Sequence, residues 1–193
     1  MIKYPNKKND IKLINNSNLK FFPVIECNSI TDYINANVVT VGTKFKINNW
    51  NITCIDINDN DYYFQYDDCI SEVNSWNELS EALEKIWHDT NIIPEELRKE
   101  IGYIFIPTEK QITGINKYGD KEKDTYQFEY YKNNEAHRVK NYNGKTDWYW
   151  LASPCSGNST YALFVDNDGV VDSYSVTGTV GRVPVCFKIK KES

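Results

Sequence analysis

Few residues of this chain could perform nucleophilic catalysis. Such catalysis pairs a Ser or Cys nucleophile with a base, most often His, and the 193 residues contain only two histidines, His88 and His137. His88 lies near the end of a predicted helix and His137 in a polar stretch, where helix capping or exposure explains a histidine. Phosphate-binding motifs of the GxxxxGK[ST] and GxGxxG types are absent. We therefore expect no enzyme activity, no catalytic residues and no cofactor.

Two acidic stretches could supply oxygen ligands for calcium. In residues 56–67, Asp56, Asn58 and Asn60 occupy positions 1, 3 and 5 of an EF-hand-like loop, but Asp61 and Asp67 replace its Gly and its final Glu. The flanking residues alternate as strands, whereas an EF-hand requires helices. The second stretch, DNDG at 166–169, can form a tight turn without an ion. Both stretches are predicted to be hairpin turns, and no metal site is expected.

A binding surface is the chemistry that remains. Residues 156–179 concentrate Ser, Asn, Asp, Gly, Thr and Tyr. Antibody recognition loops have a similar composition, because Tyr supplies contact area and small polar groups supply adaptable hydrogen bonds. Turns use the same small polar residues. Composition alone therefore leaves a ligand-binding surface and ordinary turns equally open.

Strand patterns frame this segment on both sides. Alternating apolar and polar residues indicate two or three antiparallel strands within 38–70 and further strands after residue 147. In the second group, the DNDG turn joins two alternating runs, and Gly169 can take the positive φ that a tight turn demands. The pattern predicts a hairpin at 159–176 and a last strand within 182–190.

Two helices are predicted between the two groups of strands. Ser75 can cap residues 76–89, whose apolar side chains fall on one face, and Glu78 is placed for a capping box. Pro94 suits the start of a shorter helix over 95–101, and Gly102 is placed to end it. A helical turn is also expected at 29–36, capped by Asn28 or Ser29. Residues 103–107 are predicted to form a buried strand.

Residues 1–40 differ from the rest of the chain. They are polar and rich in Asn as far as Asn18, and the first twenty carry a local excess of Lys. We interpret them as a solvated or docking extension, followed by one domain over 41–190. Residues 115–147 form a long polar connection, and the aromatic residues within 126–132 indicate that it is ordered.

Composition excludes several classes of protein. A net charge of -5, from 27 acidic and 22 basic residues, argues against a nucleic-acid partner. No run approaches the roughly 20 apolar residues of a membrane span, and the start lacks a secretory signal, so membrane insertion and export are not expected. The five cysteines include no CxxC pair, which indicates reduced thiols. The 23 Asn against 5 Ala favour a low-GC genome.

The C-terminal motifs are similar to those of a known family. YWLASP (149–154), YALFVDNDGVV (161–171) and GRVPVCFKI (181–189) resemble the WWLRSP, SDG and GVRP pattern of a bacterial and prophage family with a C-type-lectin-like fold. Residues 42–57, 75–101 and 103–114 resemble its upstream strand pair, helices and E-x-x-G motif in the same order. The resemblance covers about residues 40–190, and the same fold occurs in phage tropism-determining and retroelement-diversified ligand-binding proteins.

The chain departs from the pattern at several points. Arg182 stands one position away from the Arg of GVRP, on the opposite strand face, and Ala152 stands where Arg is frequent. The calcium and sugar motifs of animal C-type lectins are missing, and no motif matches the cysteines of formylglycine-generating enzymes. The resemblance therefore implies neither calcium-dependent sugar binding nor that enzyme activity.

The resemblance implies an α+β, C-type-lectin-like fold, with two helices packed on mixed, mostly antiparallel short sheets and an N-terminal extension. It also implies that Trp150 and Leu151 are core residues and that residues 156–179 form an exposed face, which varies among related ligand-binding proteins. The expected ligand-binding residues are Tyr149, Ser156, Asn158, Ser159, Tyr161, Asp172, Tyr174, Thr177 and Thr179.

The function implied is that of a non-catalytic phage or prophage virion component, such as a tail-fibre, receptor-binding or decorating protein, assembled in the bacterial cytoplasm. Its expected partners are a host-surface protein or glycan, other virion subunits through residues 1–40, and further copies of the chain as a homo-oligomer. The alternative is a purely structural virion or assembly protein that uses the domain for subunit contacts.

Overall fold

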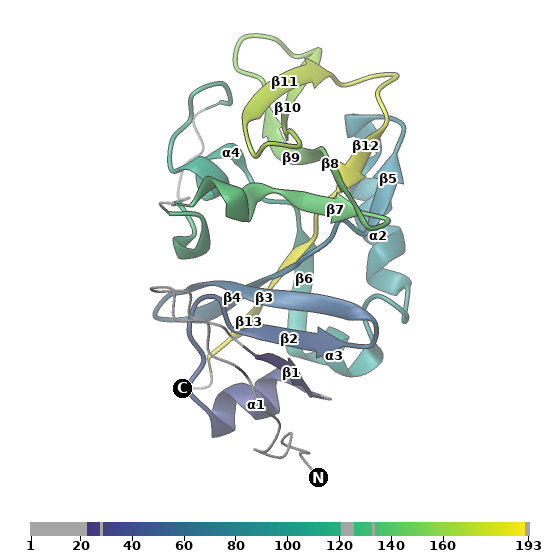
Figure 1. Cartoon of the computed structure of the whole chain (residues 1–193). Helices are drawn as coiled ribbons and strands as arrows, with labels where there is room; N and C mark the ends of the chain where they lie inside the picture. Colours follow the sequence, from purple (N-terminus) through teal and green to yellow (C-terminus); the bar gives the residue numbers. More distant parts are fainter. Residues whose placement is uncertain (1–22, 28, 121–125, 133, 192–193) are drawn as a thin grey trace.

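The protein is a mixed α/β molecule made mostly of sheet. The computed structural model describes residues 23–27, 29–120, 126–132 and 134–191. They form a six-stranded sheet, a five-stranded sheet and a two-stranded ribbon, with the two larger sheets at opposite ends of the molecule (Figure 1). Most strand pairs are antiparallel, and β1–β2 and β9–β12 are parallel. The prediction of mixed, mostly antiparallel sheets is confirmed.

The six-stranded sheet has the order β1-β2-β3-β4-β13-β6. Its strands are β1 (Val24–Glu26), β2 (Lys44–Ile47), β3 (Trp50–Ile57), β4 (Asp61–Tyr66), β6 (Ile101–Phe105) and β13 (Cys186–Lys190). The acidic stretch after Asp56 is the β3–β4 turn. There the Asn58 side chain accepts hydrogen bonds from the backbone N–H groups of Asn60 and Asp61. The hairpin predicted here is confirmed.

Two elements lie before the predicted domain start at residue 41. β1 pairs with β2, and α1 (Ile30–Ala36) follows directly, with the Ser29 hydroxyl accepting the backbone N–H of Asp32 at 2.9 Å. Ile30 is fully buried and belongs to the larger hydrophobic core. The predicted domain boundary at residue 41 is therefore too late. Residues 1–22 of the predicted extension lie outside the described residues.

The two predicted central helices are present. The 3-10 turn η1 (Trp76–Glu78) leads into α2 (Leu79–His88), and the Ser75 side chain caps it by accepting the N–H of Asn77. The Glu78 carboxylate accepts the N–H of Asn74 rather than that of the cap residue. α3 (Glu95–Glu100) begins after Pro94 as predicted.

Two details of the helices differ from prediction. Gly102 does not end α3, because the backbone is already extended at Ile101, where β6 starts; the glycine lies inside that strand. A further helix, α4 (Glu109–Thr113), follows β6. Thr108 and Gln111 form its capping box, and Gly114 ends it with a φ of 84°. Among the described residues, no helix is long and apolar enough to cross a membrane.

The five-stranded sheet has the order β11-β10-β9-β12-β5. Its strands are β5 (Ser71–Val73), β9 (Tyr149–Pro154), β10 (Tyr161–Val165), β11 (Val171–Ser175) and β12 (Gly181–Val183). The predicted hairpin turn joins β10 to β11. One Asp166 carboxylate oxygen accepts the N–H groups of Asp168 and Val170, and Gly169 has a φ of 85°. A ribbon of β7 (Lys140–Tyr142) and β8 (Lys145–Asp147) precedes β9.

The two faces of the five-stranded sheet are buried by different parts of the chain. Because side chains alternate along a strand, Leu151, Leu163 and Val165 point to one face, which we call the covered face. Three side chains pack there: Ile112 of α4, Phe128 directly before the 3-10 turn η2 (Glu129–Tyr131), and Tyr131 within it. The turn η3 (Glu135–Arg138) continues this segment.

The opposite face, which we call the open face, carries Trp150, Ala162 and Val176. These side chains join the larger core, which continues into the six-stranded sheet. Trp150 and Leu151 are both fully buried, which confirms their prediction as core residues. Beyond Trp150, toward the β10–β11 hairpin, the open face is only partly filled.

Candidate functional site

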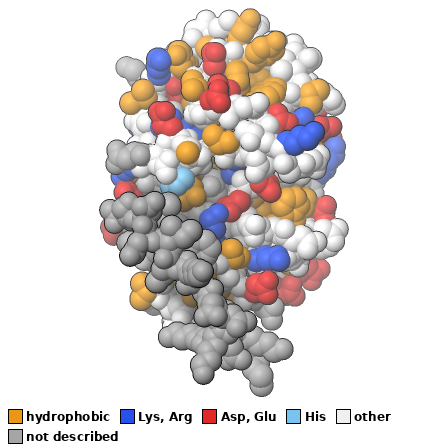
Figure 2. All heavy atoms as spheres, viewed as in Figure 1, with side chains coloured by type: hydrophobic (Ala, Val, Ile, Leu, Met, Phe, Trp, Pro, Cys, Tyr) orange, Lys and Arg blue, Asp and Glu red, His pale blue; other side chains and the backbone are white. Residues whose placement is uncertain are grey.

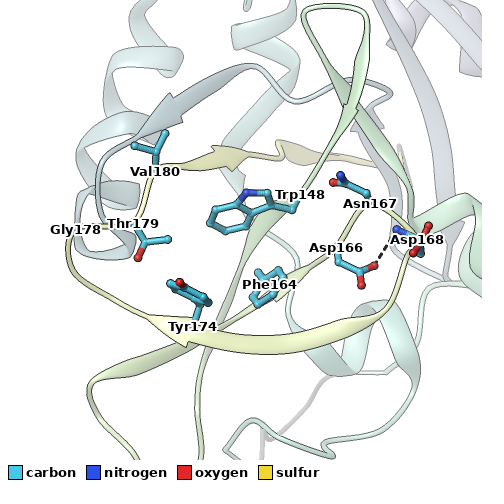
Figure 3. Close-up of a pocket in the computed structure, with 9 residues that line it drawn as sticks. All are labelled: Trp148, Phe164, Asp166, Asn167, Asp168, Tyr174, Gly178, Thr179 and Val180. Carbon is cyan, nitrogen blue, oxygen red and sulfur yellow. Dashed lines mark hydrogen bonds between the residues drawn. The ribbon is translucent and has the colours of Figure 1, made fainter.

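A pocket of about 580 Å³ occupies the unfilled part of the open face. Figure 3 shows its lining arranged around the Trp148 indole, with the β10–β11 turn on one side and the loop before β12 on the other. The lining residues are Trp148, Phe164, Asp166, Asn167, Asp168, Tyr174, Gly178, Thr179 and Val180.

Three aromatic rings form the floor of the pocket. The Phe164 ring lies between the other two, with its centroid 5.2 Å from that of Trp148 and 6.4 Å from that of Tyr174. The interplanar angles are 72° and 79°, an edge-to-face geometry that aromatic pairs favour. The floor is therefore a cup of rings at steep angles, which can hold a flat group on one ring while another ring meets its edge.

The position of the floor depends on close backbone approach at Gly181. A Cβ atom at this residue would overlap the indole nitrogen of Trp150 and lie 2.8 Å from Cη2 of Trp148. Trp150 in turn packs against Trp148 with ring centroids 5.0 Å apart. β12 can therefore pass behind the two indoles only because residue 181 is glycine.

The rim of the pocket is acidic on one side and apolar on the other. Asp166, Asn167 and Asp168 form one side, and Val180, 46% exposed, stands on the other. The nine lining residues include two carboxylates and neither Lys nor Arg. Figure 2 shows acidic and hydrophobic side chains intermingled at the end of the molecule that β10 and β11 form.

Arg182, the nearby arginine of the sequence motif, is committed to other partners. Its guanidinium donates to Asp147 at 2.7 Å and to Glu72 at 2.6 Å, and it lies 4.6 Å from the centroid of the Tyr142 ring. These contacts tie β12 to β5 and to the β7–β8 ribbon. The shift of this Arg relative to the family pattern thus gives it ion pairs between strands, and its charge does not line the pocket.

The structure brings only two of the predicted binding residues into the pocket, Tyr174 and Thr179. Thr177 and Asp172 are exposed nearby but do not line it. The others lie elsewhere on the surface: Ser156, Asn158 and Ser159 in the β9–β10 loop, and Tyr161 at the start of β10. Tyr161 pairs with Ser175 and Ala162 with Tyr174, so strand alternation directs Tyr161 and Tyr174 to opposite faces of the sheet.

The prediction of Tyr149 as a ligand contact is wrong. Its side chain is fully buried on the covered face, and its hydroxyl donates to the carbonyl oxygen of Arg138 at 2.6 Å. Burial raises the pKa of this phenol well above its ordinary value. Tyr149 shares a strand face with Leu151, and the segment around η3 closes over it, so a ligand cannot reach the ring.

Sequence reasoning missed most of the pocket: Trp148, Phe164, Asp166, Asn167, Asp168, Gly178 and Val180. A signal for its floor was present, because Trp148, directly before β9, and Trp150 within it are two residues apart, and their rings pack against each other. The DNDG stretch was interpreted as a turn alone. In the structure it is both a turn and one side of the pocket.

A buried acid fastens the connection that follows α4. The Glu109 side chain is 1% exposed, and its carboxylate accepts the N–H of Gly119 at 2.8 Å and that of Tyr118 at 3.1 Å. The backbone N–H of Glu109 donates to the Ser153 hydroxyl on β9. These bonds anchor residues 115–119 to the five-stranded sheet, so this acid has a structural task away from the pocket.

Three of the cysteines are buried, and one of the two histidines is occupied by neighbouring groups. Burial raises the pKa of the Cys54, Cys69 and Cys186 thiols to about 12, which suppresses the reactive thiolate. The His137 ring stacks on Tyr130 at 4.0 Å, and its nitrogens contact the Tyr130 carbonyl and the Asn134 amide. Within the described ranges, no three His, Cys, Asp or Glu side chains are grouped to hold a metal ion.

One comparison with known proteins identifies a family. The family described as "Domain of unknown function (DUF6273)" matches residues 95–191, half of the chain, and the chain belongs to this family. The matched region runs from α3 to the end of β13 and includes every residue that lines the pocket. No curated protein and no solved structure matches the chain.

Proposed function

We propose that this member of the DUF6273 family is a non-catalytic binding protein that holds its ligand in the aromatic pocket of the open face. The observation that carries the proposal is the pocket itself. Ligand sites are typically concave, mostly apolar and lined by a few polar groups, and this pocket combines three aromatic rings with an acidic turn. Tyr174 is 54% exposed, and together with Phe164 and Trp148 it gives the pocket a contiguous aromatic surface.

The groups around the pocket support binding better than catalysis. Its lining contains no His, Cys or Lys, and the titratable groups in it are Asp166, Asp168 and the Tyr174 phenol. One oxygen of Asp166 is committed to two backbone N–H groups of its own turn. A general acid and a general base must both reach the reacting atoms, and Asp168 is left without a second free carboxylate beside it.

A matched pair of variants tests this function. Purified full-length protein is screened against glycan and peptide arrays, and each hit is measured again with Tyr174→Ala and with Tyr161→Ala. The two tyrosines belong to neighbouring strands of one sheet, and only Tyr174 lines the pocket. We expect the ligand to bind about tenfold more weakly to Tyr174→Ala, since an exposed aromatic anchor contributes roughly 1–2 kcal/mol, and equally well to Tyr161→Ala. A ligand that both variants bind like the unaltered protein would contradict the proposal.

The biological setting that we propose is a phage or prophage virion, in which the pocket contacts a host-surface protein or glycan. The C-terminal motifs and their order support this setting, because they resemble those of a prophage family with C-type-lectin-like ligand-binding relatives. Mass spectrometry of purified particles should find the chain among the virion proteins, and the purified protein should compete with particles for adsorption to cells. Its absence from particles would exclude the setting and leave the pocket assignment intact.

A purely structural role in the particle is the alternative. In that case a neighbouring subunit would fill the pocket, and cryo-electron microscopy of the particle would show density against Trp148 and Tyr174.

We further propose that the finer fold class is C-type-lectin-like, supported by helices α2 and α3 preceding the terminal strands. An experimental structure whose strands superpose on that fold in the same order would test the assignment.

A further inference from the structure

We propose that the ligand presented to this pocket is an arginine side chain on the surface of a partner protein. This inference rests on the proposed binding function and specifies its chemistry. Three observations support it: the shape of the aromatic floor, the sign of the charge on the rim, and the apolar residues that flank the opening.

The aromatic floor suits a planar cation. Aromatic ring faces carry partial negative charge and attract a cation within about 6 Å of the ring centroid. Guanidinium is flat and weakly hydrated, so it stacks on rings more readily than an ammonium group does. The Trp148 and Phe164 rings meet at 72°. A guanidinium stacked on one of these two rings therefore directs its N–H edge toward the other ring.

The charge on the rim selects a positive ligand. Asp168 lines the pocket, and within the described ranges its carboxylate makes no hydrogen bond or ion pair, so it is available to a ligand. The nearest arginine of the motif, Arg182, is already paired with Asp147 and Glu72. An anionic ligand would meet two carboxylates without compensation, whereas a guanidinium can donate two parallel hydrogen bonds to one of them.

The surroundings of the opening indicate that the cation belongs to a protein. Val180, 46% exposed, forms part of the rim, and Val170, 53% exposed, follows the acidic turn on the other side. Protein interfaces are enriched in aromatic and apolar side chains at the centre and carry polar groups at the rim, and the rings, the two valines and the acidic turn provide these components. A glycan could stack on the rings, but it would gain nothing from the net negative charge of the rim.

The test uses the full-length chain and three small probes followed by NMR titration: N-acetyl-arginine amide, its neutral isostere N-acetyl-citrulline amide, and N-acetyl-lysine amide. We expect the arginine probe to bind about tenfold more tightly than citrulline, since the two differ mainly in charge. We also expect it to bind more tightly than lysine, and to weaken as salt is raised. Equal binding of arginine and citrulline, or tighter binding of lysine, would overturn the inference.

Two carboxylate variants locate the interaction. Asp168→Asn should weaken the arginine probe about fivefold, whereas Glu84→Gln, which changes an exposed acid of α2 outside the pocket, should leave it unchanged. Equal loss in both variants would indicate a general charge effect and overturn the site. If the arrays yield a ligand that depends on Tyr174 while the arginine probe does not bind, the inference fails and the proposed function stands. If no ligand depends on Tyr174, the proposed function itself fails.

Discussion

The covered and open faces of the five-stranded sheet are made by alternate residues of the same strands, yet their side chains differ in burial. On the covered face, Tyr149, Leu151 and Leu163 are fully buried under α4 and η2. On the open face, Trp150 is fully buried, but Phe164 is only partly covered and Tyr174 is exposed. A single residue step along a strand therefore separates a side chain that stabilises the fold from one available to a ligand.

The difference arises from what covers each face. The segment from α4 to η3 covers the first and is fixed by side-chain contacts such as that of Tyr149 with the Arg138 carbonyl. The open face packs on the larger core near Trp150, and among the residues that the structure describes no segment covers Trp148 and Tyr174 in this way. Substitutions should accordingly cost stability on the covered face and affinity on the open face.

The largest effect on stability is expected for Leu151→Ala. This side chain is fully buried on the covered face, and truncating a buried Leu costs roughly 2–5 kcal/mol in lost transfer energy and cavity formation. Denaturant unfolding followed by fluorescence measures the change. Val180→Ala, on the exposed rim of the open face, is the control and should change the unfolding free energy by less than about 0.5 kcal/mol. Equal losses in the two variants would contradict the division between the faces.

Alkaline pH should destabilise the protein through the covered face. Cys69 and Cys186 lie there, and burial raises the pKa of each thiol from its ordinary 9.0 to about 12. A raised folded-state pKa stabilises the fold below pH 9, and that contribution is lost as pH rises from 9 toward 12, by up to about 1.4 kcal/mol per pH unit for each thiol.

Unfolding free energies at pH 7, 9 and 10 measure this loss. The variant Cys186→Ala lacks one of the titrating groups, so its stability should fall less steeply with pH than that of the unaltered protein. Thiol labelling at neutral pH provides a second measurement, because Cys69 and Cys186 should react only after unfolding. Rapid labelling of either residue in the native protein would show that the covered face opens.

A smaller loss is expected for Tyr149→Phe. The change keeps the ring packed and removes the hydroxyl that donates to the Arg138 carbonyl, so a polar group is left without its partner at a cost of about 1 kcal/mol. Thermal unfolding measures it. Ligand affinity should not change, since the hydroxyl points away from the pocket face. A loss of affinity without a loss of stability would restore Tyr149 as a contact residue.

The smallest effect on stability is expected for Tyr174→Ala, because the ring is more than half exposed. The unfolding free energy should change by less than about 0.5 kcal/mol, although affinity for the ligand should fall about tenfold. The contrast with Tyr149→Phe is the sharpest comparison of the two faces. A destabilisation above 1 kcal/mol would mean that Tyr174 serves the core rather than a ligand.

The longer strands, the Ser75 and Pro94 helix starts, the Gly169 turn and the core role of Trp150 could be predicted from the sequence, because each depends on local pattern or turn chemistry. The short strands β1, β5, β7 and β8 were not predicted. The position of Tyr149 could also have been obtained from alternation with Leu151. The sequence did not allow us to predict which face of the sheet would be covered. That depends on Phe128 and Tyr131, which pack on it from more than fifteen residues upstream. For the same reason, composition placed the binding residues on one segment, whereas the sheet divides them between two faces.

The close packing at Gly181 has a consequence for engineering new specificities. The floor of the pocket is held by backbone and buried indoles, while both sides of the rim, 166–169 and 177–180, are short loops. These two loops could be exchanged as cassettes to recognise other ligands without redesigning the sheet beneath them. Such a library should retain Gly181, and also Gly169, where a Cβ atom would lie 2.8 Å from the Glu135 carbonyl oxygen. Sequence variation in such a library should be confined to the two loops, with both glycines kept unchanged.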